Sequence, residues 1–282
     1  MKKLISLLLI LVFISSACAQ KQVSYIIYTE SSLTEYDSLA SDTKENVSFE
    51  RLNERDFDFV TETEVTNSKA PSKKEVNIGQ NNFSMALKKS YITAISECEN
   101  EKLAYIGKID RYETADRGVE AHFRQDTKEL VFFLNYNLEK SADTLTDEEA
   151  KELADKLFIS LYGEDKLREY THTRISNDNT ENSVTYFRYV HGYETNDTVS
   201  IKFNKHGELY SLNANRMGTF EDAEEVISKV DIEKAVKVLT DTIGDEWTPT
   251  HHFLTIDSTG NYFIAIGALN GDYAERFYIN IN

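Results

Sequence analysis

A capped amphipathic helix followed by short alternating strands is the pattern that most constrains the fold of this chain. Thr146 and Glu149 stand three positions apart before an apolar run, which is the spacing of a capping box. Apolar residues then recur every three or four positions as far as Leu161, and Gly163 follows. The segments SVTYFRYV, DTVSIKF and ELYSL alternate apolar and polar residues, so they predict strands on which the apolar face of this helix can pack.

The same order returns in shorter form toward residue 282. Asp231 is predicted to cap a second helix that ends at Gly244. Three strand-like segments follow, HHFLTI, YFIAI and YAERFYININ, separated by the turn sequences DSTGN and LNGD. We therefore expect the chain from Leu145 onward to fold as helix, meander, helix, meander.

The preceding segment shows strand patterns without a helix. Val76 and Ile78 alternate with polar residues before the turn sequence GQNN, and Phe83 and Met85 alternate after it, which predicts a hairpin. Further strands are expected in the sequences around LAYIGKI, VEAHF and LVFFL. An antiparallel meander is the simplest arrangement of such closely spaced strands.

The chain therefore predicts an α+β fold class, with antiparallel β-meanders each packed against an α-helix and an N-terminal mostly-β region before them. Its parts are expected at residues 1–19 (signal), 20–74 (polar tether with irregular strands), 75–142 (first meander), 143–220 (helix plus meander) and 228–282 (second, shorter helix plus meander).

The N-terminus has the features of an export signal. Lys2 and Lys3 precede an apolar run from residue 4 to residue 14, which is shorter than the roughly 20 residues that span a bilayer. The small residues Ala17 and Ala19 would direct cleavage before Gln20. The first expected outcome is therefore a secreted chain.

The same residues also allow a lipid anchor. Ser16, Ala17 and Cys18 resemble the bacterial lipoprotein box, which implies diacylglyceryl attachment to Cys18, although Ser15 stands where that box usually has leucine. Two acyl chains would hold the protein firmly to a membrane. The expected location is extracytoplasmic, either secreted or lipid-anchored to the outer face of the cell membrane through Cys18.

Composition excludes several classes of function and stabilisation. The chain has 48 acidic residues against 31 basic ones and no basic stripe, so a nucleic-acid partner is not expected. Without the signal only Cys98 remains as a cysteine, so no intramolecular disulfide can form and stability must come from the core.

No recognised catalytic or metal motif stands out in the sequence. His251 and His252 are adjacent, but neighbours in a strand point to opposite faces and cannot easily hold one ion. Cys98 lies among acidic residues that would raise its pKa and blunt its reactivity. The single histidines lie in strands or turns: His122, His172, His191 and His206. We therefore predict no catalytic, cofactor-binding or metal-binding residues and no cofactor.

Two segments together resemble a known family. LTDEEAKELADKLF, followed by VTYFRYVHGYETNDTVSIKFNKHGELYSLN, is similar to the helix and hairpin of PepSY-like domains. Such domains occur in propeptides of thermolysin-type proteases and in exported proteins and lipoproteins of Gram-positive bacteria. The resemblance implies a small cystatin-like α+β module that binds or inhibits peptidases and has no catalytic residues of its own.

An internal echo supports a repeated fold unit. YETADRGVEAHFRQDTKEL at residues 112–130 is similar to YETNDTVSIKFNKHGEL at residues 193–209. Apolar residues kept in register and polar residues kept at turns are demands of a hairpin, so Glu and Asp are expected to solvate its exposed ends. The aligned apolar pairs are Phe123 with Phe203, Leu130 with Leu209, and Phe133 with Leu212.

The sequence thus predicts an exported, non-enzymatic binding or regulatory module whose partner is a peptidase or another cell-envelope protein or peptide. Two alternatives stay open: a structural or accessory cell-surface lipoprotein, and a hydrolase whose site is assembled from distant residues. Contact with the membrane is expected only through a lipid on Cys18.

Overall fold

The computed structural model describes ten segments of the chain. They are residues 25–29, 47–51, 60–79, 81–95, 107–138, 145–177, 182–204, 206–243, 246–256 and 261–281. The expected signal at residues 1–19, Cys18 and Cys98 lie outside them. No helix of the described segments is long and apolar enough to cross a membrane.

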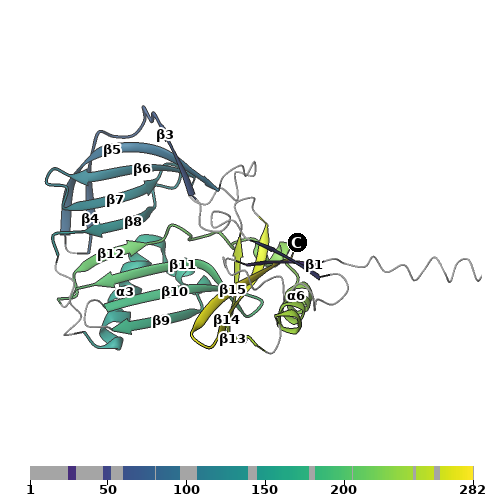
Figure 1. Ribbon diagram of the computed structural model, residues 1–282. Helices are drawn as coiled ribbons and strands as arrows, with labels where there is room; N and C mark the ends of the chain where they lie inside the picture. The colour runs from purple at the N-terminus through teal and green to yellow at the C-terminus, as the bar shows by residue number, and fades with distance from the viewer. Residues whose placement is uncertain are drawn as a thin grey trace, which may run out of the picture.

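The described residues form strands and a few helices, which confirms the α+β class (Figure 1). The strands are β1 (Tyr25–Thr29), β2 (Val47–Arg51), β3 (Val60–Val65), β4 (Lys73–Ile78), β5 (Asn81–Ile95), β6 (Gly107–Thr114), β7 (Val119–Arg124), β8 (Leu130–Asn135), β9 (His172–Asn177), β10 (Asn182–Val190), β11 (Tyr193–Phe203), β12 (Leu209–Asn213), β13 (Thr248–Ile256), β14 (Tyr262–Asn270) and β15 (Tyr273–Asn280). The helices are α3 (Asp147–Tyr162), α4 (Glu164–Glu169), α5 (Ala223–Val226) and α6 (Lys229–Thr242).

The strands join into one continuous ladder of hydrogen bonds. Its order is β2-β1-β15-β14-β13-β11-β12-β8-β7-β6-β5-β3, with β10 and β9 extending from β11 and β4 pairing with β5. Among the described strands, β1–β2 and β11–β13 pair parallel and the other pairs are antiparallel. Strand β5 pairs with β4 through its first half and with β3 through its second half.

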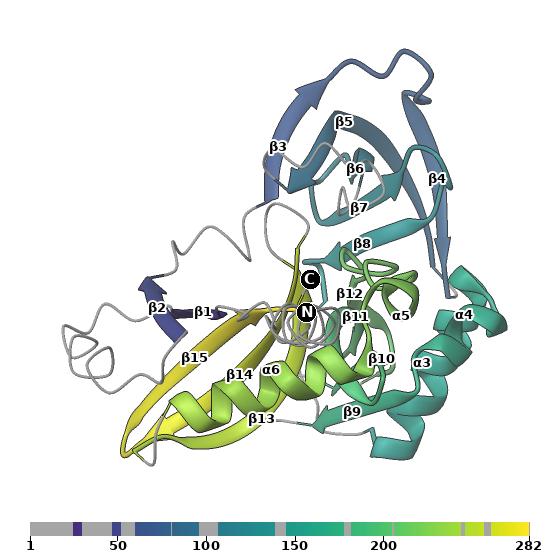
Figure 2. The ribbon, with the colours of Figure 1, turned by 90° about the vertical axis from the view of Figure 1, so that its right-hand side faces the viewer.

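Helix α3 packs on one face of strands β9 to β12, as its apolar stripe predicts (Figures 1 and 2). Its buried residues are Ala150, Ala154, Leu157 and Phe158. They share one hydrophobic core with the β4–β8 meander and with β10, β11 and β12. Burying a large apolar side chain such as Phe158 contributes roughly 2 kcal/mol relative to leaving it exposed.

The start and end of α3 are those expected from the sequence. The Thr146 hydroxyl accepts from the Glu149 N–H, and the Glu149 carboxylate accepts from the Thr146 N–H, so both bonds of the capping box are present. Gly163 ends the helix with φ +90°, a conformation that favours glycine.

The start of α6 differs from the expectation that Asp231 is its cap. Ser228 is the N-cap, and its hydroxyl accepts from the Asp231 N–H at 3.2 Å. Asp231 lies one turn inside the helix, where its carboxylate accepts from the Ser228 hydroxyl. The prediction was wrong because Ser and Asp are both good caps and the sequence places them three apart. Gly244 lies outside the described residues.

A second core lies around α6 and the C-terminal strands (Figure 2). Helix α6 packs on β14 and β15, and β1 adds to the outer side of β15, with Ile27 fully buried. Tyr91, Ile109 and Val131 of the first meander reach into this core. The N-terminal strands are therefore built into the ladder, β1 beside β15 and β3 beside β5.

The hairpins β7–β8 and β11–β12 are the repeated unit that the echo predicts. Ala121 pairs with Phe133 in the first, and Ile201 pairs with Leu212 in the second. Each hairpin then shifts register at the corresponding position, just before Phe123 and just before Phe203. Strands β8 and β12 pair antiparallel with Phe133 opposite Leu212, so the two hairpins are related by a local twofold axis.

The first part of the echo does not form the same structure twice. Its Tyr-Glu-Thr ends β6 before a turn in the first copy but begins the long strand β11 in the second. Asp116 is exposed in the β6–β7 turn, whereas Asp197 is fully buried. The expectation that both acidic residues solvate exposed ends was therefore wrong for Asp197, because β11 continues through that position.

Candidate binding cleft

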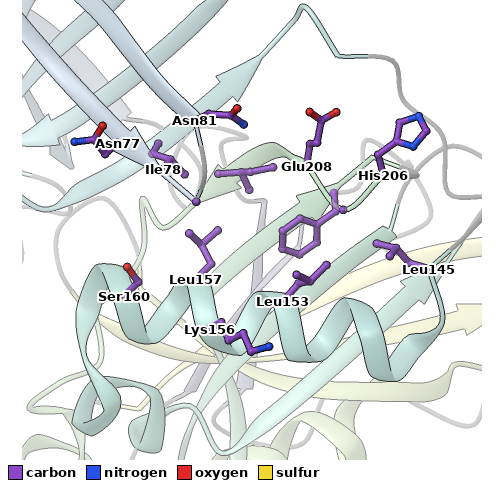
Figure 3. A pocket seen from close by; sticks show the side chains of 14 residues that line it. Asn77, Ile78, Asn81, Leu145, Leu153, Lys156, Leu157, Ser160, His206 and Glu208 are labelled. Atoms are coloured by element: carbon purple, nitrogen blue, oxygen red, sulfur yellow. The ribbon is translucent and has the colours of Figure 1, made fainter.

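A cleft of about 650 Å³ lies between α3 and the tips of two hairpins (Figure 3). This volume is within the usual range of small-ligand sites. Three elements line it: the β4–β5 turn, the middle and C-terminal part of α3 together with Leu145 just before its N-cap, and the β11–β12 turn. The lining residues are Asn77, Ile78, Gly79, Asn81, Leu145, Leu153, Lys156, Leu157, Ser160, Phe203, His206, Gly207, Glu208 and Leu209.

Helix α3 supplies one wall of the cleft. Leu153, Lys156, Leu157 and Ser160 follow the i, i+3, i+4, i+7 spacing of one helix stripe. With a rise of 1.5 Å per residue this stripe is about 10 Å long. Ile159, the neighbour of Ser160, does not line the cleft and is 41% exposed.

The floor is made of core side chains. Ile78, Leu157, Phe203 and Leu209 line the cleft and also belong to the core beneath α3. Their positions are fixed by packing, so the apolar floor exists before any ligand arrives.

The β11–β12 turn is organised by one buried side chain. Asn204 is 3% exposed, and its Oδ1 accepts from the N–H groups of His206 and Glu208 at 3.0 Å each. Gly207 has φ +74°, and a Cβ placed there would lie 3.1 Å from the Leu153 Cδ1. The glycine thus lets the turn approach α3 closely and close that end of the cleft.

The two charged groups of the cleft already have partners. The Lys156 ammonium donates to Glu152 at 2.6 Å, and the Glu208 carboxylate accepts from the Asn204 amide at 2.9 Å. The side chains of Asn81, Ser160 and His206 stand along the rim in Figure 3, whereas that of Asn77 points away from the cleft, on the face of β4 opposite Ile78.

A buried carboxylate, that of Asp197, lies within β11 and outside the cleft lining. Asp197 accepts from the Tyr170 hydroxyl at 2.7 Å and from the N–H groups of Gly218 and Phe220 at 3.1 Å. The Arg188 guanidinium nitrogen Nη1 lies 3.9 Å from the Asp197 carboxylate oxygen Oδ2, and it also pairs with the Glu169 carboxylate. Burial raises the pKa of the Asp197 carboxyl. The pKa of the Tyr170 hydroxyl is also raised, first by burial and then by the neighbouring Asp197 carboxylate. The bonds fasten the connector at residues 214–222 to strand β11.

The histidines singled out in the sequence are scattered. His206 alone among them lines the cleft. His122 lies between the Tyr91 hydroxyl and the Glu120 carboxylate on the other face of the first meander. His172 stacks on Tyr189, and His191 contacts the Ile227 carbonyl oxygen.

The adjacent pair on β13 is likewise separated. His251 is exposed and stacks on Phe253, while His252 is half-buried. Burial lowers the pKa of His252. Their different exposures fit residues on opposite faces of a strand.

The sequence did not single out the cleft. Its residues come from three segments whose strands and helix meet only in the folded chain. The α3 stripe gave no separate signal, because the polar residues Lys156 and Ser160 border its apolar face as they would on any amphipathic helix.

Comparisons with known proteins place this part of the chain. No curated protein matches the sequence. A solved structure, the Bacillus megaterium YpeB C-terminal domain, has 9% sequence identity and a TM-score of 0.35, with 80% of this chain and 86% of that chain covered. Residues 110–216 match the family model described as the YcdB, YcdC repeated domain, DUF4901. This matched segment spans less than half of the chain and holds both hairpins, α3 and most of the cleft, so this part of the chain is similar to that repeated domain.

Proposed function

We propose that the chain is an exported, non-enzymatic binding module that holds a polypeptide segment of a peptidase or cell-envelope partner in the cleft. The observation that carries this proposal is the preformed apolar floor edged by polar side chains. In the same proposal, each helix with its meander is a cystatin-like, PepSY-like unit, and such units are expected to act by binding.

The arrangement of polar groups favours binding over catalysis. Nucleophilic catalysis needs a hydroxyl or thiol within hydrogen-bond reach of a base. Ser160 and His206 are the hydroxyl and imidazole of the lining, and they stand at different ends of the cleft in Figure 3. The two remaining charged groups, Lys156 and Glu208, are held by their own neighbours.

Site-specific cross-linking tests the proposal. A small aliphatic diazirine side chain at Ser160 of the mature chain is compared with the same group at Ile159, which lies on the same helix outside the lining. Both proteins are incubated with a secreted thermolysin-type protease and with envelope extract. We expect a discrete adduct from position 160 that excess unlabelled chain suppresses. Equal labelling from both positions, or none from either, contradicts the proposal.

Anchoring through Cys18 is a separate proposal about location. A diacylglyceryl group there would keep the module at the outer face of the membrane. The mass of the mature N-terminal peptide distinguishes acylated Cys18 from a free chain that begins at Gln20. Release of a Cys18→Ala variant into the medium is expected, and a wild-type chain found free in the medium contradicts anchoring.

A further inference from the structure

The charges of the cleft differ from those of the chain as a whole. The chain has 48 acidic residues against 31 basic ones, but among the lining residues Glu208 is the one carboxylate and Lys156 the one ammonium. Each is bonded within the chain, Lys156 to Glu152 and Glu208 to Asn204. The Lys156 pair lies at the exposed edge, so a charged ligand group placed on the apolar floor would leave water without a partner of opposite charge beside it.

The dimensions of the cleft restrict the ligand further. The α3 stripe from Leu153 to Ser160 is about 10 Å long. An extended chain advances about 3.3 Å per residue, so about three residues fit along it. Core side chains lie beneath this length, and the amide of Asn81 and the hydroxyl of Ser160 stand beside it.

These features together identify a class of ligand. Apolar side chains would occupy the floor, and the backbone amides of an extended peptide would hydrogen-bond with the asparagine and serine groups of the rim. An acyl chain would fill the floor equally well but would make no hydrogen bonds with the rim groups, whereas a peptide backbone can make them, which favours a peptide.

We infer that the cleft is selective for a short, extended, uncharged peptide segment with apolar side chains. The inference rests on the proposed binding function and adds the chemistry of what is bound. It also predicts that a bulky side chain at the lip blocks the site, because Ser160 is exposed there and lies outside the core.

Affinities for a matched peptide series test this ligand class. The probes are N-acetylated, C-amidated pentapeptides of sequence Gly-X-Ser-X-Gly, in which both X residues are Val, Glu or Lys, so that both X side chains of the extended peptide face the floor. Monolaurin is the lipid probe. Binding to the mature chain is measured by calorimetry. We expect the Val peptide to bind roughly tenfold more tightly than the Glu or Lys peptide, since a charge there is desolvated without a partner.

Two helix variants locate the binding. Ser160→Trp is expected to lower the affinity for the Val peptide by about tenfold or more, because the indole occupies the edge of the cleft at this position. Ile159→Trp places the same side chain on the same helix outside the lining and should keep affinity within about twofold. Equal weakening by both variants overturns the assignment to the cleft.

The outcomes separate the ligand class from the function. A cross-link from position 160 combined with equal or tighter binding of the charged peptides, or with tighter binding of monolaurin, overturns the inference and keeps the binding function. Failure of the cross-link and of every peptide overturns both.

Discussion

The hairpins β7–β8 and β11–β12 have the same register and the same shift, yet their turns lie in different surroundings. Because β8 and β12 pair antiparallel, the two turns lie at opposite ends of the sheet. The first turn lies beside the connector, where the Arg124 guanidinium donates to the Met217 carbonyl oxygen. The second turn closes the cleft against α3. A repeated unit can therefore serve structure at one end and a candidate binding site at the other.

The largest expected effect tests whether the two hairpins are energetically equivalent. Phe133 and Leu212 face each other across the local axis and are 1% and 0% exposed. Replacing either by Ala leaves a cavity, so each variant should lose about 3 to 4 kcal/mol of unfolding free energy in urea. The double variant should lose less than the sum, because the two side chains are direct neighbours.

An exposed aromatic residue provides the control for this pair. Tyr136 follows β8 and is 59% exposed, so Tyr136→Ala should change the unfolding free energy by less than about 0.5 kcal/mol. Circular dichroism follows the whole chain, and Trp247 fluorescence follows the second core. A loss at one of the two buried positions and not at the other would show that the hairpins share geometry but not stability.

The next effect concerns the connector end. Asp197→Ala removes the acceptor of the Tyr170 hydroxyl and of the Gly218 and Phe220 N–H groups, all in a buried place. Stranding these donors should cost about 3 kcal/mol of unfolding free energy. We expect circular dichroism and Trp247 fluorescence both to shift to lower urea, since the connector joins the two cores.

A second aspartate in the same connector is the matched control. Asp222 is exposed and its side chain makes no capping bond to α5. Asp222→Ala should therefore stay within about 0.5 kcal/mol of wild type. If Asp197→Ala is equally mild, the buried carboxylate does not fasten the connector.

How far the sequence could predict these features depends on how local their causes are. The α3 capping box and the equivalence of Phe133 with Leu212 lie within short patterns, and both are confirmed. The burial of Asp197 could not be found in this way, because the same letters end a strand in one copy and continue one in the other. The cleft depends on the pairing of distant strands, which no local pattern specifies.

A smaller effect is expected at the cleft end. Asn204 holds the His206 and Glu208 N–H groups, and Asn204→Ala should cost about 1 to 2 kcal/mol of unfolding free energy. The same variant should also lower the affinity for the Val peptide, because the turn that closes the cleft loses its internal hydrogen bonds. Thr127→Ala in the other turn is the comparison. Its hydroxyl bonds at an exposed site, so stability and peptide affinity should both stay near wild type. If Thr127→Ala also lowers the affinity for the peptide, then the β7–β8 turn affects binding as the β11–β12 turn does, and the two turns do not have separate roles.

The smallest effect concerns the helix start beside Leu145, at the cleft end of α3. Bonds from the Thr146 N–H and hydroxyl hold the pKa of Glu149 below its usual value of 4.5. Because the pKa is lower in the folded chain than in the unfolded chain, this carboxylate stabilises the fold above about pH 4.5 and loses that contribution as the pH falls through the folded value.

Glu149→Gln keeps the shape of the cap but removes the titration, so its unfolding free energy should change less steeply between pH 3 and 6 than that of wild type. Glu148→Gln removes the same charge in the same first turn but outside the capping box, and it is the matched control. Equal slopes for all three proteins would show that the cap titrates as it does in the unfolded chain, and α3 would then owe its position at the cleft to core packing alone.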